Sequence, residues 1–197
     1  MTSTVPVPRR ERLLEEAARL FSTRGFHAVG IDDIGAAAGI SGPGVYRHFA
    51  SKQALLEALC DRAMTRMLDG ARQINAAEDD PYSALQALVD LHVAFTVSER
   101  PLIGVWVREA RSLSDDVRRS LRNRMRAYEQ QWLQVLSLLR DDLTADEVAV
   151  VTGSTLAMLN GTAFASPVVG PDELARHLRR MALAALLARR TPGRRPS

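Results

Sequence analysis

The chain has 197 residues, of which 46% are hydrophobic and 25% are charged, so it can bury a sizeable core and remain soluble. Its formal net charge of +3 is too small to identify a nucleic-acid partner, although all but one of its 26 basic side chains are arginines. A single cysteine excludes an internal disulfide. No apolar run has transmembrane length and no signal-peptide segment is present, so we expect a cytoplasmic protein that does not contact a membrane.

The first helix is predicted to follow a flexible lead that ends in Arg9, Arg10 and Arg12. It has an apolar stripe from Leu13 to Phe21 and stops at Gly25, after Arg24. A second helix is predicted from Ile31, because its apolar residues recur at three- and four-residue spacing and two aspartates occupy its first turn. Gly39 ends this helix. The break and restart that follow indicate a helix-turn-helix.

The next helix is predicted to start at Ser41, which can cap it, with Pro43 in its first turn, where a missing N–H is tolerated. Val45 and Phe49 then face the interior. This arrangement leaves Gly42, Pro43, Tyr46, Arg47 and His48 on the outside or at its margin, where they can contact another surface.

A longer helix is predicted to begin at Ser51 and to continue to about Ile74. Lys52 lies in its first turn, where the helix dipole disfavours a cation. A phosphate bound beside the same N-terminal amides would offset that penalty, so we favour a phosphate contact over a purely structural role. Cys60 occupies an apolar position of this helix, and we expect it to be a core residue.

Five further helices are predicted from breaks and caps at 81–99, 101–112, 115–139, 144–164 and 171–189. Thr144 and Glu147 form the capping-box pattern of the fourth of these. This helix is apolar all round, so a second subunit is expected to cover part of it. We found no strand pattern and no repeat. The predicted fold is all-α, with about nine helices.

The stretch from about Glu11 to Leu56, through AARLFSTRGFHAVGIDDIGAAAGISGPGVYRHFASKQALL, resembles the N-terminal pattern of TetR-family transcriptional repressors of the arginine-rich, actinobacterial type. Beyond residue 60 the resemblance is one of architecture. It implies a DNA-binding domain over residues 1–52, a helical ligand-binding and dimerisation domain over 53–190, and a disordered basic tail over 191–197.

Position by position, the resemblance places a major-groove face at the start of the second helix of the motif. Lys52 would anchor the DNA backbone, and Gly30 stands where the family commonly has a threonine, so its contact must come from the backbone N–H or be absent. Arg47 is the main candidate for base readout, because arginine can pair bidentately with guanine. For Tyr46 and His48 the alternative is packing under the turn. The predicted DNA contacts are Gly30, Ser41, Gly42, Pro43, Tyr46, Arg47, His48 and Lys52.

The resemblance also implies a pocket for a small, largely apolar effector, such as an acyl chain or an aromatic metabolite, without a cofactor. For each candidate taken alone, core packing is the alternative. The pocket candidates are Met64, Leu68, His92, Phe95, Trp106, Glu109, Met125, Tyr128, Trp132 and Met158. The predicted dimer interface consists of Val151, Thr155, Leu159, Leu174, Leu178 and Met181.

These expectations describe a homodimer that places two recognition helices in successive major grooves of a palindromic, double-stranded operator, about 34–36 Å apart. The effector would relieve repression by changing that spacing. An enzyme is disfavoured, because the four histidines lack metal-ligand spacing and no nucleophile motif or phosphate loop is present. The alternative is a helical interaction module, or a ligand-binding protein without specific DNA binding.

Overall fold

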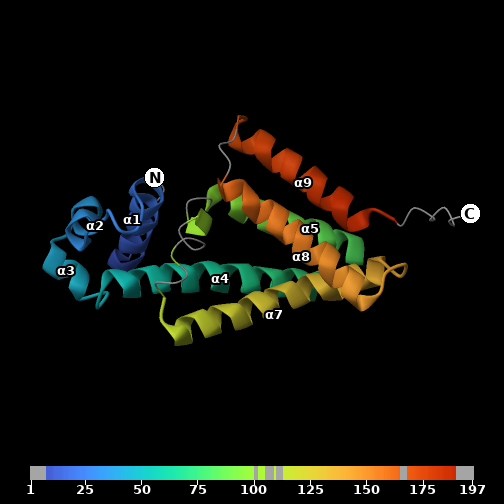
Figure 1. The fold of residues 1–197 in the computed structure, drawn as a ribbon, viewed down its shortest axis with the longest axis horizontal. Helices are drawn as coiled ribbons and strands as arrows, with labels where there is room; N and C mark the ends of the chain where they lie inside the picture. Colours follow the sequence, from blue (N-terminus) through green and yellow to red (C-terminus); the bar gives the residue numbers. More distant parts are fainter. Residues whose placement is uncertain (1–7, 100–101, 105–108, 110–112, 165–167, 190–197) are drawn as a thin grey trace, which may run out of the picture. The chain divides into compact units, whose positions relative to one another are not determined.

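The computed structural model describes residues 8–99, 102–104, 109, 113–164 and 168–189, and within these ranges all regular structure is helical (Figure 1). The all-α prediction is therefore confirmed. The helix predicted over 101–112 and the tail at 191–197 lie largely or wholly outside the described residues. The elements are α1 (Arg9–Arg24), α2 (Ile31–Ala38), α3 (Gly42–Tyr46), α4 (Lys52–Ala77), α5 (Pro81–Ser98), α7 (Asp115–Leu139), α8 (Ala145–Gly161), the short 3-10 helix η2 (Thr162–Phe164) and α9 (Pro171–Leu187).

The helices form two compact units. The head unit comprises Met1–Met64 with Pro101–Arg122, and the bundle unit comprises Thr65–Arg100 with Asn123–Ser197. Helices α4 and α7 each contribute residues to both units. The predicted domain boundary at residue 52 stays a prediction.

The core of the head unit is built from the apolar faces of α1, α2 and α3 and the first turns of α4. Phe21, Ile34 and Val45 are fully buried there, and the Phe21 and Phe26 rings meet edge to face at 5.0 Å. Burial of a large apolar side chain contributes about 1.5–3 kcal/mol, so this small module has a substantial core. Cys60 is buried in the same cluster, as expected, and burial raises the pKa of its thiol to about 12.

The turn between α2 and α3 depends on two glycines. Gly39 adopts φ +73°, a left-handed conformation that favours glycine, and its N–H bonds to the carbonyl of Ala36. At Gly35 a side-chain Cβ would lie 2.9 Å from the carbonyl oxygen of Ile40, so a larger residue would push the turn away from α2. The predicted stop at Gly39 is confirmed.

The caps of the longer helices agree with the sequence pattern. Ser51 Oγ accepts the N–H of Ala54 at 3.0 Å, and Asp80 accepts that of Ser83 at 2.8 Å. Thr144 and Glu147 form the predicted reciprocal capping box. These contacts fix where α4, α5 and α8 begin.

The side-chain cap expected from Ser41 is absent, although Ser41 holds the N-cap position of α3. A cap accepts from the second or third N–H of a helix. The second residue is Pro43, which has no N–H, and the N–H of Gly44 donates instead to the Ser41 carbonyl at 2.8 Å. The prediction of a serine cap was therefore wrong, and the backbone alone starts α3.

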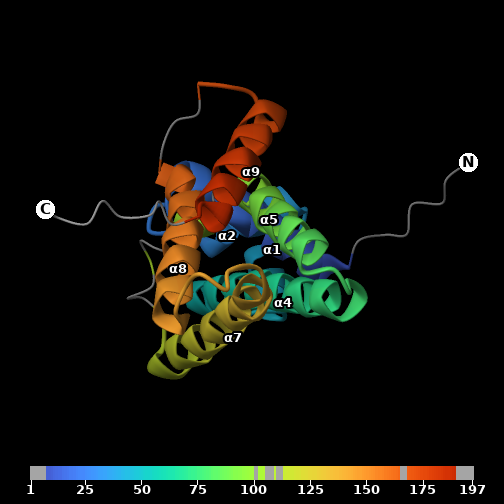
Figure 2. The same ribbon diagram turned by 90° about the vertical axis from the view of Figure 1, so that its right-hand side faces the viewer.

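In the bundle unit, α5, α8 and α9 pack against one another, as the two views in Figures 1 and 2 show. Their facing residues are almost completely buried, as is Trp132 of α7. Arg140, at the end of α7, is also buried: it pairs with Asp142 and donates to the carbonyl of Leu186 at 2.8 Å. This buried guanidinium therefore ties the end of α7 to the last turn of α9.

Candidate nucleic-acid interface and effector site

The end of α3 exposes a group of side chains suited to contact with DNA. Tyr46 is 57% exposed, and Pro43, Arg47 and His48 are also exposed. Arg47 continues the helical backbone of α3, with φ −71° and ψ −22°. Within the described part of the chain it makes no hydrogen bond or ion pair, so its guanidinium is available to a ligand.

Two of the predicted DNA contacts lie in more restricted positions. Gly42 is buried, because the Asp32 carboxylate lies against it: a Cβ on Gly42 would be 1.9 Å from Asp32 Oδ1. The N–H of Gly30 donates to Asp33 Oδ2 at 2.8 Å. That hydrogen bond, aided by Arg24, lowers the pKa of Asp33. A phosphate contact through the Gly30 N–H would therefore have to displace Asp33.

Lys52 is held inside the head unit. Its ammonium donates to the carbonyls of Phe26 at 2.9 Å and Val29 at 2.8 Å, and it lies 4.6 Å from the centre of the Phe26 ring. These contacts offset the unfavourable position of a cation at a helix start. These contacts give Lys52 a structural role, which the sequence ranked below a phosphate contact. A phosphate contact by Lys52 stays a prediction.

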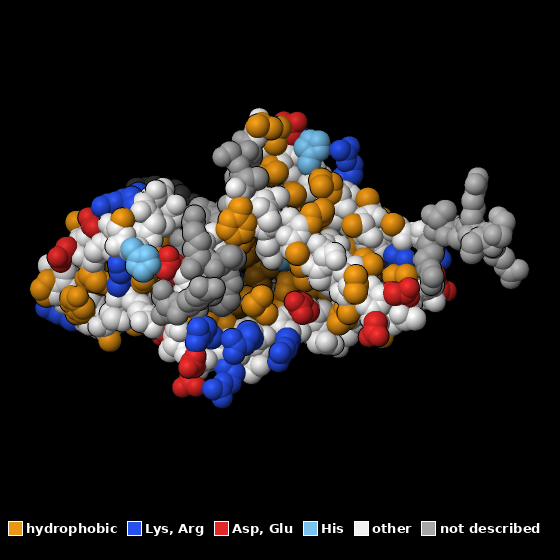
Figure 3. Space-filling view, viewed as in Figure 1, with side chains coloured by type: hydrophobic (Ala, Val, Ile, Leu, Met, Phe, Trp, Pro, Cys, Tyr) orange, Lys and Arg blue, Asp and Glu red, His pale blue; other side chains and the backbone are white. Residues whose placement is uncertain are grey.

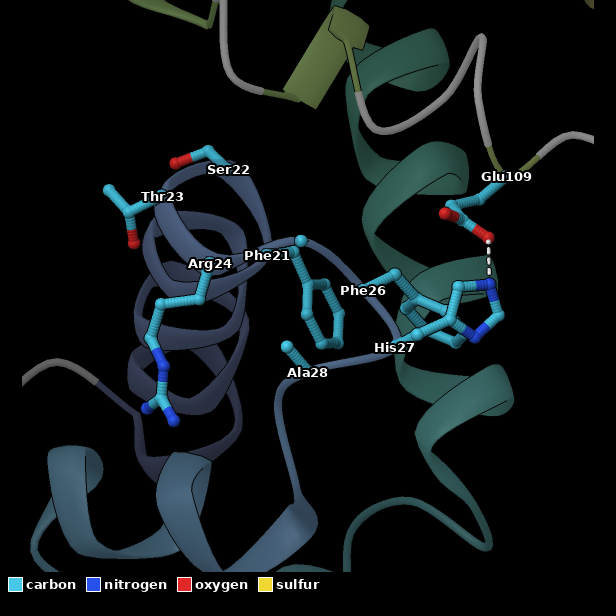
Figure 4. Close-up of a pocket in the computed structure, with 9 residues that line it drawn as sticks. Phe21, Ser22, Thr23, Arg24, Phe26, His27, Ala28 and Glu109 are labelled. Carbon is cyan, nitrogen blue, oxygen red and sulfur yellow. Dashed lines mark ion pairs between the residues drawn. The ribbon is translucent and has the colours of Figure 1, made fainter.

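A shallow pocket of about 370 Å³ lies at the end of α1 in the head unit (Figure 4). His27 and Glu109 pair across it, with Nε2 and Oε2 3.2 Å apart, beside Phe26. Glu109 thus belongs to the head unit, whereas the aromatic effector candidates Tyr128 and Trp132 belong to the bundle unit. The sequence did not indicate that the effector candidates lie in two different units.

In the bundle unit, three effector candidates from two helices come together. His92 Nδ1 lies 2.9 Å from the Tyr128 hydroxyl, and Trp132 meets both rings edge to face. His92 Nε2 lies 3.2 Å from Oδ1 of Asn160, which sequence reasoning missed. His92 is only 4% exposed, and burial lowers its pKa to about 4, so its imidazole is neutral at pH 7. The geometry therefore defines a buried, uncharged polar chain across α5, α7 and α8.

The remaining effector candidates are scattered. Leu68 is buried, Phe95 and Met158 are half-buried, and Met125 is 36% exposed. Met64 packs against the core of the head unit. Trp106 lies outside the described residues. Their role in binding an effector stays a prediction.

The predicted dimer residues divide between the core and the surface of this chain. Thr155, Leu159 and Leu178 are buried within the chain itself, whereas Met181 is 47% exposed and Val151 and Leu174 are half-buried. Hydrophobic side chains gather over α8 and α9 on the face shown in Figure 3. Val150 of α8, which the predicted interface does not include, is 67% exposed. The apolar pattern of α8 indicated a helix that is covered on several sides. It did not indicate which of those sides packs against other helices of the same chain.

The described residues contain no group of metal-ligating side chains and no helix long and apolar enough to cross a membrane. A helix-turn-helix with an exposed Tyr–Arg–His end, joined to a second helical unit with a buried polar cluster, defines a DNA-binding transcriptional regulator. Similarity to known protein families specifies which one it is. Residues 13–59 match the model of bacterial regulatory proteins of the tetR family, and residues 78–186 match the tetracyclin repressor-like C-terminal domain. The chain belongs to the TetR family.

Three similar proteins illustrate the relationship. The HTH-type transcriptional repressor KstR2 of Mycobacterium tuberculosis is 29% identical over 147 residues, which cover 71% of this chain and 74% of that protein. The HTH-type transcriptional activator FasR of Mycolicibacterium smegmatis is 38% identical over 87 residues, covering 44% of this chain and 40% of the relative. The structure of the regulator PfmR from Thermus thermophilus superposes with a TM-score of 0.78 at 23% identity, over 89% of this chain and 97% of that one, which shows the shared fold.

The contacts of Lys52 predict that Lys52→Met destabilises the protein in the absence of DNA. Two hydrogen bonds from a charged donor are lost, so the free energy of unfolding should fall by about 1–3 kcal/mol in denaturant titrations. Arg47→Met, at an exposed position without partners, should change it by less than about 0.5 kcal/mol. Equal stability of the two variants would show that the Lys52 contacts contribute nothing to folding.

The environment of His92 predicts a loss of stability in acid. The pKa of His92 is about 4 in the folded chain and about 6.5 when unfolded, so between these values the unfolded state binds more protons. Stability should fall as the pH drops below about 6.5, by about 2 kcal/mol at pH 5. His92→Gln should remove this part of the pH dependence in denaturant unfolding, whereas His177→Gln, at an exposed site, should retain it. An unchanged slope for His92→Gln would contradict the assignment.

Proposed function

We propose that the protein is a homodimeric repressor that binds a palindromic operator and releases it when a small, largely apolar effector occupies the bundle unit. The observation that carries this proposal is the exposed, unpartnered Arg47 beside Tyr46, at the end of a recognition helix that Gly35, Gly39 and a buried core hold in place. A rigid head with a free guanidinium suits base readout in a major groove.

Repression is favoured over activation by the extent of the similarities. The match to the repressor KstR2 extends over 147 residues, whereas the match to the activator FasR extends over 87. The sign of regulation can be measured with a reporter gene placed behind the selected operator.

Dimer formation is proposed through α8 and α9. Val150 is 67% exposed and Met181 47% exposed, and α8 also exposes glycine and alanine, which allow two helices to approach closely. The exposed small residues of α8 are Ala149, Gly153, Ala157 and Gly161. An isologous contact between these faces in two subunits would place two heads on one DNA molecule.

Effector binding in the bundle unit can reach the head through α4 and α7, because each helix contributes residues to both units. The effector regulates only if it binds the DNA-free arrangement more tightly, and a typical coupling free energy is about 1–3 kcal/mol. A neutral polar cluster in an apolar surrounding suits such a ligand.

Arg47→Ala should weaken operator binding and relax sequence preference. The operator is obtained by selection from a random double-stranded DNA library, and affinity is measured by fluorescence anisotropy. Loss of one bidentate base contact costs about 1–3 kcal/mol, or roughly 5- to 150-fold. Arg126→Ala, on the exposed side of α7, is the control and should bind as the wild type does. No selection of any sequence by the wild type would favour the interaction-module alternative.

Met181→Glu should convert the dimer to monomers, because it introduces two carboxylates into the proposed apolar contact. Sedimentation equilibrium gives the mass directly. Leu138→Glu changes an equally apolar, 72% exposed residue on α7 and should leave the oligomeric state unchanged. A dimer that survives Met181→Glu and Val150→Glu together would place the interface elsewhere.

A further inference from the structure

The interior of the bundle unit contains polar atoms without a partner. Trp132 Nε1, Thr96 Oγ1, Thr152 Oγ1 and Asn75 Oδ1 are buried, and none of these atoms has a hydrogen-bond partner among the described residues. Trp132 and Thr96 are each 0% exposed. An unsatisfied buried polar group costs about 1–3 kcal/mol, so two of them beside one polar cluster indicate a functional requirement rather than a packing accident.

The hydrogen bonds of His92 show which hydrogen-bond donors and acceptors of the cluster remain unused. If Asn160 Oδ1 accepts from His92 Nε2–H, then His92 Nδ1 must accept from the Tyr128 hydroxyl, because a neutral imidazole carries one proton. The Tyr128 oxygen keeps its acceptor capacity. The Trp132 N–H interacts with that oxygen only weakly: it opposes the rise in the Tyr128 pKa that burial causes, but it makes no hydrogen bond of normal geometry, so an effector oxygen can still accept it.

Thr96 lies one helical turn beyond His92 on α5, on the same buried face. Its hydroxyl adds a second donor, which can also accept. We propose that Trp132 and Thr96, beside the His92–Tyr128–Asn160 chain, bind a neutral oxygen-bearing group of the effector, a hydroxyl or a ketone carbonyl on an apolar skeleton. This inference rests on the proposed function and names the chemical class of its effector.

The charge of the surroundings excludes an ionised group at this position. Among the described residues of the bundle unit, the buried polar or charged side chains are those of His92, Thr96, Thr152, Thr155 and Arg140. Arg140 is their one permanent cation, and Asp142 already pairs with it. His92 is neutral at pH 7. A buried carboxylate would have no counter-ion here, whereas a hydroxyl or carbonyl needs only the free donors.

The test uses three probes of equal length: 1-decanol, 2-decanone and decanoate. In the full-length Trp106→Phe variant Trp132 is the sole tryptophan, and its fluorescence reports binding without DNA. The alcohol and the ketone should bind at least about 10-fold more tightly than decanoate at pH 7.5. Thr96→Val, made in the same variant, should weaken both neutral probes by roughly 3- to 10-fold. Tyr128→Phe should weaken the alcohol, which can donate to the Tyr128 oxygen, but not the ketone, which has no donor. Equal or tighter binding of decanoate, or no response to any probe, would overturn the proposal.

Thr155→Val provides the matched control, because the Thr155 hydroxyl already donates to the carbonyl of Val151 at 2.8 Å. It should leave probe affinity unchanged. Without probe, Thr96→Val should raise the melting temperature by roughly 2–4 °C, since it removes an unsatisfied hydroxyl at constant shape. A lower melting temperature together with unchanged probe affinity would show that Thr96 is structural. Because no DNA is present, failure here is distinct from failure of the operator experiment.

Discussion

The ammonium of Lys52 holds together the part of the molecule on which recognition depends. It joins the first turn of α4 to the segment between α1 and α2 through the carbonyls of Phe26 and Val29. Those carbonyls lie in a loop, where that of Phe26 also accepts the N–H of Val29 at 3.4 Å, and a cation that bonds to both of them fixes the loop. The position of α2 follows, and with it the turn at Gly39 and the direction of α3. A charge that is unfavourable for α4 alone is therefore favourable for the head unit.

The bundle unit is organised by a different constraint, the burial of uncharged polar groups in an apolar interior. The chain from Tyr128 through His92 to Asn160 is satisfied internally, while Trp132 and Thr96 beside it are not. Such partly satisfied interiors reduce stability and are characteristic of binding sites, where a ligand supplies the missing partners. The burial of apolar residues on α5, α8 and α9 offsets the free energy that these unsatisfied groups cost.

The two units also use arginine differently. Arg140 is buried and fully engaged, and it holds the ends of α7 and α9 together. Arg47 is exposed and unengaged at the end of α3. The same residue type thus stabilises the fold at Arg140 and is left available for the proposed base contact at Arg47, and the difference lies in the partners that the surrounding chain provides. A count of arginines could not distinguish these roles.

The sequence alone determined the all-α class, the family, the caps at Ser51, Asp80 and Thr144 and the stop at Gly39. Helix periodicity, caps and stops depend on neighbours within four residues, and the sequence displays those neighbours. Tertiary structure decided what depends on distant neighbours. It directed Lys52 to two loop carbonyls, buried Thr155 and Leu178 within the chain, and placed Asn160 beside His92. Ser41 is the exception on the local side: Pro43 has no N–H to donate, and the N–H of Gly44 bonds to the Ser41 carbonyl, so the side-chain cap that the residue type suggested does not form.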